Sequence, residues 1–241
     1  MEIKLIKDPY YEGEKIFHKN SFVLEPNTVT CLVGCNGSGK STIVDQIICS
    51  TKAEQIETDT VYVDLRGALR SIAGRGEGEK PKYYYFLFNK KTETASKFED
   101  HIFNKIGESS VSTGEHIVNR YSNSLPILGS WIRSHNNEKL FVIFDDCDAG
   151  TSIDMIDEIK DVFQLIINDC VKYDIEYYII LTANSFELAK DFDCLSVIDF
   201  KHRHFKTYQS FKTFVLKTRE AVNKREEEFR ELRKQCKEEG R

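Results

Sequence analysis

Apolar residues along this chain gather in short runs that alternate with longer segments of mixed polarity. Runs rich in β-branched and aromatic residues predict strands at 28–33, 83–88, 140–144, 177–181 and 197–200. Apolar positions at helical spacing predict helices at 41–48, 152–169 and 186–190. Strands that alternate with helices predict an α/β fold, in which a mainly parallel sheet is flanked by helices.

The two ends of the chain follow other patterns. Residues 3–6 and 21–24 predict short strands that form an antiparallel edge. From Val215 the chain reads as a charged helix in which Val222, Phe229 and Cys236 are seven apart, while Thr218 and Arg225 interrupt the other seam. This favours one apolar stripe that docks on the domain or on a partner over a coiled coil. We therefore predict one domain at 1–214 and a charged C-terminal helix at 215–241.

Composition narrows the class of protein. The 241 residues are 40% hydrophobic and 30% charged, as in an ordinary globule with a core. No apolar run approaches the ~20 residues of a membrane span, which predicts a cytoplasmic protein without membrane insertion. The seven cysteines include no C-x-x-C pair, which favours reduced thiols. A net charge of −5 gives no support for a nucleic-acid surface at the whole-chain level, and leaves room for a local patch.

Residues 34–42, Gly-Cys-Asn-Gly-Ser-Gly-Lys-Ser-Thr, meet every position of the phosphate-loop pattern G-x-x-x-x-G-K-[ST]. The glycines let successive N–H groups point at a polyphosphate, and the following helix adds its positive dipole end. Lys40 would reach the β- and γ-phosphates, and Ser41 would ligate Mg²⁺. We predict that ATP and Mg²⁺ are bound here, with the phosphate contacts made by Asn36, Gly37, Ser38, Gly39, Lys40, Ser41 and Thr42.

Two carboxylates, Asp145 and Asp146, follow the apolar run at 140–144. A phosphate-loop enzyme places its Mg²⁺-directing acid at such a strand end, and Asp145 is our candidate. Asp146 would polarise or orient the attacking water. The alternative is a strand that ends in an ordinary acidic turn. Asp148 and Asp154, which follow shortly, favour the site over the turn.

Four motifs in order resemble those of ABC-type ATPases, and together they cover roughly residues 24–200. The phosphate loop resembles the family form G-x-N-G-S-G-K-S-T. Residues 111–115, Val-Ser-Thr-Gly-Glu, resemble the signature L-S-G-G-E. Residues 144–154 resemble the strand-end acid, the catalytic acid and the D-loop. Residues 181–185, Leu-Thr-Ala-Asn-Ser, resemble the switch segment T-x-H-S, with Asn184 at the histidine position.

The resemblance implies a head-to-tail homodimer that forms with ATP. Ser112 and Gly114 of one subunit would then contact the γ-phosphate held by the other, and Asp154 would lie in the contact between them. Asp146 and Asn184 would be the catalytic residues. Simpler readings stay open for two of these segments, because Ser112-x-x-Glu115 and Thr151-x-x-Asp154 also fit helix capping boxes.

Two departures from the family pattern predict slow turnover or a switch held by bound ATP. Asp146 is one methylene shorter than the usual Glu, and Asn184 cannot carry a proton as His can. No Gln follows the aromatic run at 83–88, where Asn89 is the nearest substitute for the Q-loop residue. Our leading hypothesis is an ABC-type ATPase that controls a protein effector, in DNA repair or phage defence. The rivals are a transporter ATPase subunit and an ATP-gated assembly module with negligible hydrolysis.

Overall fold

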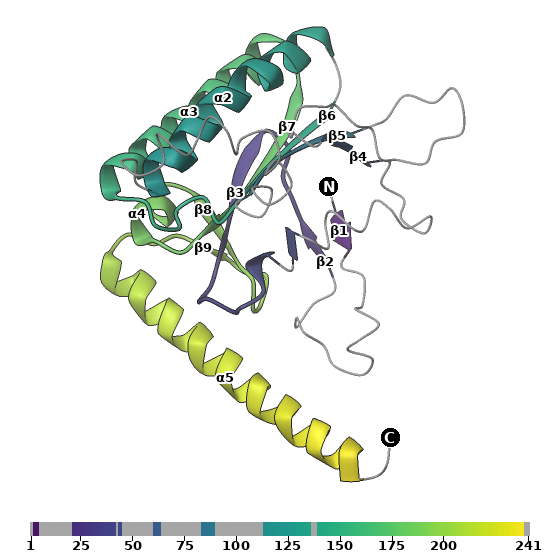
Figure 1. The fold of residues 1–241 in the computed structure, drawn as a ribbon, viewed down its shortest axis with the longest axis vertical. Coiled ribbons are helices and arrows are strands. Elements are labelled where there is room, and N and C mark those ends of the chain that lie inside the picture. The colour runs from purple at the N-terminus through teal and green to yellow at the C-terminus, as the bar shows by residue number, and fades with distance from the viewer. Residues whose placement is uncertain are drawn as a thin grey trace, which may run out of the picture.

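The computed structural model describes residues 2–4, 21–41, 43–44, 60–63, 83–89, 113–135 and 139–238. Its main sheet is built from β3 (Thr28–Val33), β4 (Thr60–Val63), β5 (Tyr83–Asn89), β6 (Lys139–Asp145), β7 (Glu176–Ala183), β8 (Asp193–Ser196) and β9 (His202–Arg203). These seven strands lie in the order β4-β5-β6-β7-β3-β8-β9 (Figure 1). All neighbours are parallel except β8 and β9. The predicted α/β class with a mainly parallel sheet is confirmed.

The antiparallel pairing predicted near the N-terminus forms between β1 (Glu2–Lys4) and β2 (Ser21–Val23). It makes a separate two-stranded sheet, so the prediction that it edges the main sheet is wrong. The strand predicted at 197–200 is also wrong, because β8 ends at Ser196 and a turn follows. The apolar residues there reflect burial in that turn, where Phe200 stacks on Phe22 with ring centroids 5.3 Å apart.

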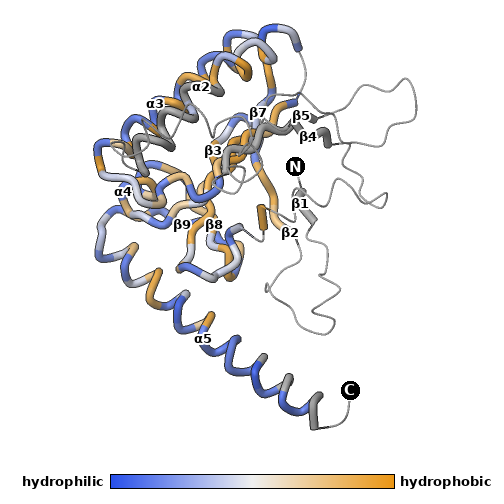
Figure 2. The backbone as a smooth tube through the Cα atoms, viewed as in Figure 1, coloured by the Kyte–Doolittle hydropathy of each residue, from blue (hydrophilic) through white to orange (hydrophobic). Residues whose placement is uncertain are grey.

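The helices described are α2 (Thr113–Ser134), α3 (Ile153–Lys172), α4 (Phe186–Ala189) and α5 (Tyr208–Glu238). Helices α2 and α3 lie side by side on one face of the sheet (Figure 1). Helix α5 begins before Val215, because the Thr207 hydroxyl accepts the Ser210 N–H at 3.2 Å and caps the helix there. Figure 2 shows α5 as mostly hydrophilic, in contrast to the strands. None of α2 to α5 is long and apolar enough to cross a bilayer.

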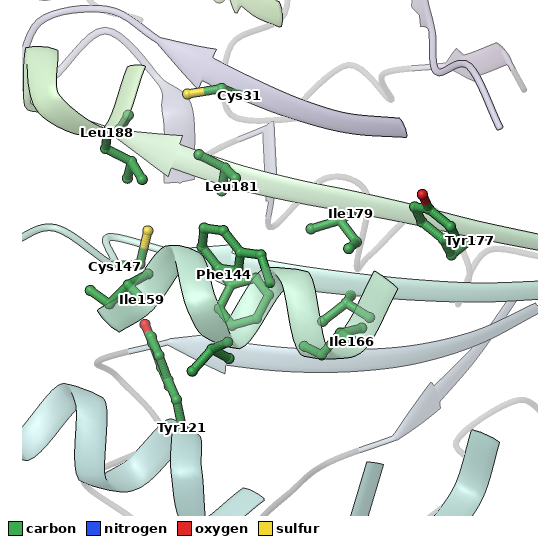
Figure 3. Packing of buried hydrophobic residues seen from close by; sticks show 14 of the residues in the cluster. Cys31, Tyr121, Phe144, Cys147, Ile159, Ile166, Tyr177, Ile179, Leu181 and Leu188 are labelled. Atoms are coloured by element: carbon green, nitrogen blue, oxygen red, sulfur yellow. The ribbon is translucent and has the colours of Figure 1, made fainter. Parts of the chain in front are cut away.

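Strand β6 shows why the sheet reads as continuous apolar runs. Leu140, Val142 and Phe144 face α2 and α3, while Phe141 and Ile143 belong to the cluster on the other face. Both faces of a parallel sheet are covered, so successive residues are apolar whichever way they point. Figure 3 shows side chains from α3 and β7 gathered around Phe144. This packing fixes the strand whose last residue is Asp145.

Candidate functional site

The predicted site residues follow three neighbouring strands. In the register of the sheet, Phe144 of β6 is opposite Leu181 of β7, and Ala183 of β7 is opposite Val33 of β3. The segments that follow these strands therefore start at one edge of the sheet, where ligands of parallel sheets bind. Asn89, the substitute for the Q-loop residue, ends β5 opposite Asp145.

The loop after β3 is shaped by its glycines. Gly37 and Gly39 have φ of 79° and 104°, a region that residues with a Cβ rarely adopt. The Ser38 N–H donates to the Cys35 carbonyl at 3.1 Å, and the Ile43 N–H donates to the Gly39 carbonyl at 2.9 Å as the helix begins. The loop thus has the curled backbone and the helix start that a polyphosphate requires.

Exposure differs along the loop. Asn36 and Gly37 are exposed and Gly39 is half-buried. Ser38 is fully buried, and its hydroxyl has no hydrogen-bond partner among the described residues. That hydroxyl lies under the loop, 2.4 Å from the position a Cβ on Gly34 would take. Thr42 lies outside the described residues.

Lys40 is buried, with 7% of its surface exposed. Its Nζ donates to the carbonyl oxygens of Gly34 at 3.0 Å and Cys35 at 3.3 Å. Burial lowers the pKa of the Lys40 ammonium below its ordinary value. Nearby carboxylates oppose that shift by favouring the charged form, and they belong to Asp148, Asp146 and Asp145. Lys40 is thus a buried cation that lies near three carboxylates.

Asp145 joins the phosphate loop to the acidic strand end. Its Oδ1 accepts from Ser41 Oγ at 3.2 Å and from Thr182 Oγ1 at 3.0 Å. The Thr182 hydroxyl in turn accepts the Asp146 N–H at 2.6 Å. Mg²⁺ takes oxygen ligands and, beside a nucleotide, needs only one or two from the protein. Ser41 and Asp145, whose oxygens lie 3.2 Å apart, could supply these two ligands.

Asp146 and Asn184 meet at the same edge. Asn184 Nδ2 donates to Asp146 Oδ1 at 2.9 Å and to Asp148 Oδ1 at 3.2 Å. Asp146 has a φ of 60°, a left-handed conformation in which Asp is among the better tolerated residues. This conformation turns the chain at the end of β6. The two predicted catalytic residues are therefore in direct contact.

Two residues of this network were not among the predicted site residues. Asp148, which is 6% exposed, accepts the backbone N–H groups of Asn184 at 2.7 Å and Ser185 at 2.6 Å. Thr182 bridges Asp145 and Asp146 as described above. The signal for Thr182 was its place in the segment that resembles the switch motif T-x-H-S, at the end of an apolar run. For Asp148 the sequence showed only one more acid in an acidic turn, and its partners lie 36 and 37 residues away.

Three predicted residues remain. Ser112 is outside the described residues, and Gly114 is in the first turn of α2. Asp154 is exposed in the first turn of α3, and the hydrogen bond from the Ser152 hydroxyl lowers the pKa of its carboxyl. The capping box proposed for Thr151 is wrong, because Ser152 occupies the N-cap and the Thr151 hydroxyl donates to the Asp148 carbonyl at 3.0 Å.

Comparison with known proteins gives little beyond this geometry. No protein-family model matches the chain, and no curated protein matches it significantly. Among solved structures, the chain is similar to a nucleotide-free ATP-binding cassette from an ABC transporter. That match has 13% identity and a TM-score of 0.41, and it covers 90% of this chain and 96% of the other. A likeness of this size carries no argument, so the interpretation of the site rests on its own residues.

Proposed function

We propose that this chain is an ABC-type ATPase that binds Mg-ATP, closes around it as a head-to-tail dimer and hydrolyses it slowly to control a protein effector. The observation that carries the proposal is the contact of Ser41 with Asp145 at 3.2 Å. It joins a phosphate loop to a strand-end acid 104 residues later, in the arrangement that a Mg-nucleotide site needs.

Each residue of the network has a role in this proposal. Lys40 and the loop N–H groups hold the β- and γ-phosphates, while Ser41 and Asp145 hold Mg²⁺, which would neutralise charge on the phosphate oxygens. Asp146 orients the attacking water and takes up its proton. Asn184 holds the Asp146 carboxylate in place through its Nδ2.

A specific contact favours a second candidate, an ATP-gated assembly module with negligible hydrolysis. Asn184 Nδ2 donates to both Asp146 and Asp148, so its amide fixes two carboxylates and cannot pass on a proton. Asp146, the proposed base, is thus fixed beside Asn184, which cannot accept or donate a proton in catalysis. Such an arrangement suits a site that binds ATP as a signal and does not hydrolyse it. Measuring turnover by the purified protein decides between the two candidates.

The dimer contact that the resemblance implies would lie at the start of α3. Ile153, which is 66% exposed, lies next to the exposed Asp154. In the proposed dimer this segment meets the second subunit, whose Ser112 and Gly114 complete the site.

The central test is titration of Mg-ATP into the parent, Lys40→Ala and Lys160→Ala. Without the buried Lys40 ammonium, the negative charge of the bound phosphates has no partner there. We therefore expect the affinity for Mg-ATP to fall about 100-fold or more. Lys160 pairs with Asp191 on the surface at 2.5 Å, and its loss should leave affinity unchanged. Equal affinity of the parent and Lys40→Ala would contradict the proposal.

The dimer is tested by light scattering under conditions that block hydrolysis. We expect a monomer without nucleotide and a dimer with Mg-ATP. Ser112→Arg should prevent the dimer through bulk and charge while leaving ATP binding to the monomer nearly intact. A dimer that still forms with this variant would place the interface elsewhere.

A further inference from the structure

The docked part of α5 carries a polar residue on its buried face. Phe211 and Val222 are 5% and 1% exposed, and Thr218 between them is 5% exposed. Beyond Val222, the described side chains of α5 are half-buried or exposed. Figure 1 shows the helix extending away from the sheet. A hydroxyl on a buried helix face needs hydrogen-bond partners. The partners of Thr218 explain why a polar residue occupies this buried position.

Thr218 Oγ1 accepts the Cys35 N–H at 3.1 Å and donates to the Val215 carbonyl of its own helix at 2.8 Å. Cys35 is 3% exposed, so its N–H is shielded from water. A buried N–H that loses its acceptor is left with the full free-energy penalty of its removal from water. The hydroxyl is thus satisfied in both directions, and it ties α5 to the second residue of the phosphate loop.

The same peptide group also touches Lys40. The Cys35 N–H and the Gly34 carbonyl belong to one planar trans peptide, so they point in opposite directions. The carbonyl accepts from Lys40 Nζ at 3.0 Å, while the N–H donates to Thr218. The orientation of a single peptide plane therefore connects the α5 hydroxyl to the ammonium of the phosphate loop.

We infer that Thr218 is a positioning residue for nucleotide binding, which acts through the Gly34–Cys35 peptide to hold Lys40 in place. This inference rests on the proposed function, because Lys40 must bind phosphate for its position to matter. The same hydrogen bond links the docking of α5 to the binding of nucleotide. Each event would then favour the other by the same free energy. Thr218 touches neither Asp146 nor Asn184 in the hydrogen bonds of the described residues, so affinity and chemistry should respond differently.

The test compares Mg-ATP affinity of the parent with Thr218→Val, Thr218→Ala, Thr218→Ser and Ile166→Val. Valine keeps the shape of threonine and loses the acceptor, so the dissociation constant should rise about fivefold to tenfold, where tenfold corresponds to about 1.4 kcal/mol. Thr218→Ala also lacks the acceptor but adds no bulk, so it should show the same loss of Mg-ATP affinity. It therefore controls for poor packing of the valine. Serine keeps the hydroxyl and should bind within about twofold of the parent. Ile166, buried in α3, controls for general destabilisation, and its variant should bind normally.

Single-turnover hydrolysis at saturating Mg-ATP should be unchanged in Thr218→Val, because binding is weakened and the catalytic carboxylate is not moved. Parent-like affinity of both Thr218→Val and Thr218→Ala would overturn the inference. So would a loss in Thr218→Ser as large as in Thr218→Val, or an equal loss in Ile166→Val. If the parent itself fails to bind Mg-ATP, the proposed function is overturned and this inference with it, which is a distinct result.

Discussion

The phosphate loop after β3 and the acidic turn after β6 lie at the same edge of the sheet but are built in different ways. The loop is shaped by local backbone geometry, with Gly37 and Gly39 in conformations that favour glycine. The acidic turn is shaped by side chains, because Asp146 adopts a φ of 60° without being glycine. The difference shows that one half of the site is encoded in a short stretch, while the other depends on contacts between distant segments.

Those contacts hold the acidic turn from two sides. The Thr182 hydroxyl accepts the Asp146 N–H at 2.6 Å, and Asn184 Nδ2 donates to its carboxylate at 2.9 Å. A left-handed conformation costs a non-glycine residue about 1–2 kcal/mol. Two hydrogen bonds of about 1 kcal/mol each can offset that cost. The turn is therefore as well defined as the loop, although no sequence pattern in it requires the conformation.

The largest effect should come from Asp146→Asn, which keeps the size of the side chain and removes its charge. Loss of a general base typically slows chemistry about 10²–10⁴-fold. We expect single-turnover hydrolysis at saturating Mg-ATP to slow on this scale while ATP remains bound in the dimer. Asp146→Glu should preserve or raise turnover by restoring the longer reach.

The matched variant for this comparison is Asp145→Asn. It should weaken Mg-dependent binding of ATP, because Asp145 is the proposed metal ligand and contacts Ser41. Hydrolysis by Asp146→Asn at the rate of the parent would mean that Asp146 is only an acidic turn residue. The catalytic assignment would then be wrong.

A smaller effect, on stability, is expected from Asp148→Asn. This variant tests the acidic turn after β6, which is held by side-chain hydrogen bonds. Asp148 Oδ2 accepts the backbone N–H groups of Asn184 and Ser185, while Oδ1 accepts from Asn184 Nδ2, and an amide cannot replace both carboxylate oxygens. The free energy of unfolding in denaturant should fall by about 2–3 kcal/mol. Asp157→Asn is the control, because Asp157 is 74% exposed and its loss should cost less than about 0.5 kcal/mol. Equal stability of the two variants would show that Asp148 does not hold the switch segment.

The smallest effects on stability should come from two glycines of the phosphate loop, and they should differ in size. A Cβ on Gly34 would lie 2.4 Å from Ser38 Oγ and 2.9 Å from Val197 Cγ2, so Gly34→Ala should cost about 2 kcal/mol through overpacking. A Cβ on Gly37 would meet no atom of the described residues within 4 Å, and Gly37 has a φ of 79°, so Gly37→Ala should cost only about 1 kcal/mol of backbone strain. Thermal or denaturant unfolding measures both. A larger loss at Gly37 would contradict this account of the loop.

The sequence predicted the main elements well where periodicity was strong. The strand at Thr28–Val33 and the helix that begins near Ser152 have the expected type, because buried strands and amphipathic helices show their own periods. The strand predicted at 197–200 failed because Val197 and Phe200 are buried in a turn. Burial makes residues apolar whatever their backbone does, so a short apolar run is ambiguous.

The candidate site divides in the same way. The sequence by itself determined the phosphate loop, since the glycines, Lys40 and Ser41 are contiguous and their backbone requirements are local. Only the tertiary structure decided that Asp148 clamps the switch segment, that Thr182 bridges two acids and that Thr218 of α5 holds the Cys35 N–H. Each of those hydrogen bonds joins residues far apart in the chain. Such a pairing depends on the register of neighbouring strands and on where a helix docks. Neither produces a periodic pattern that could be recognised in the sequence.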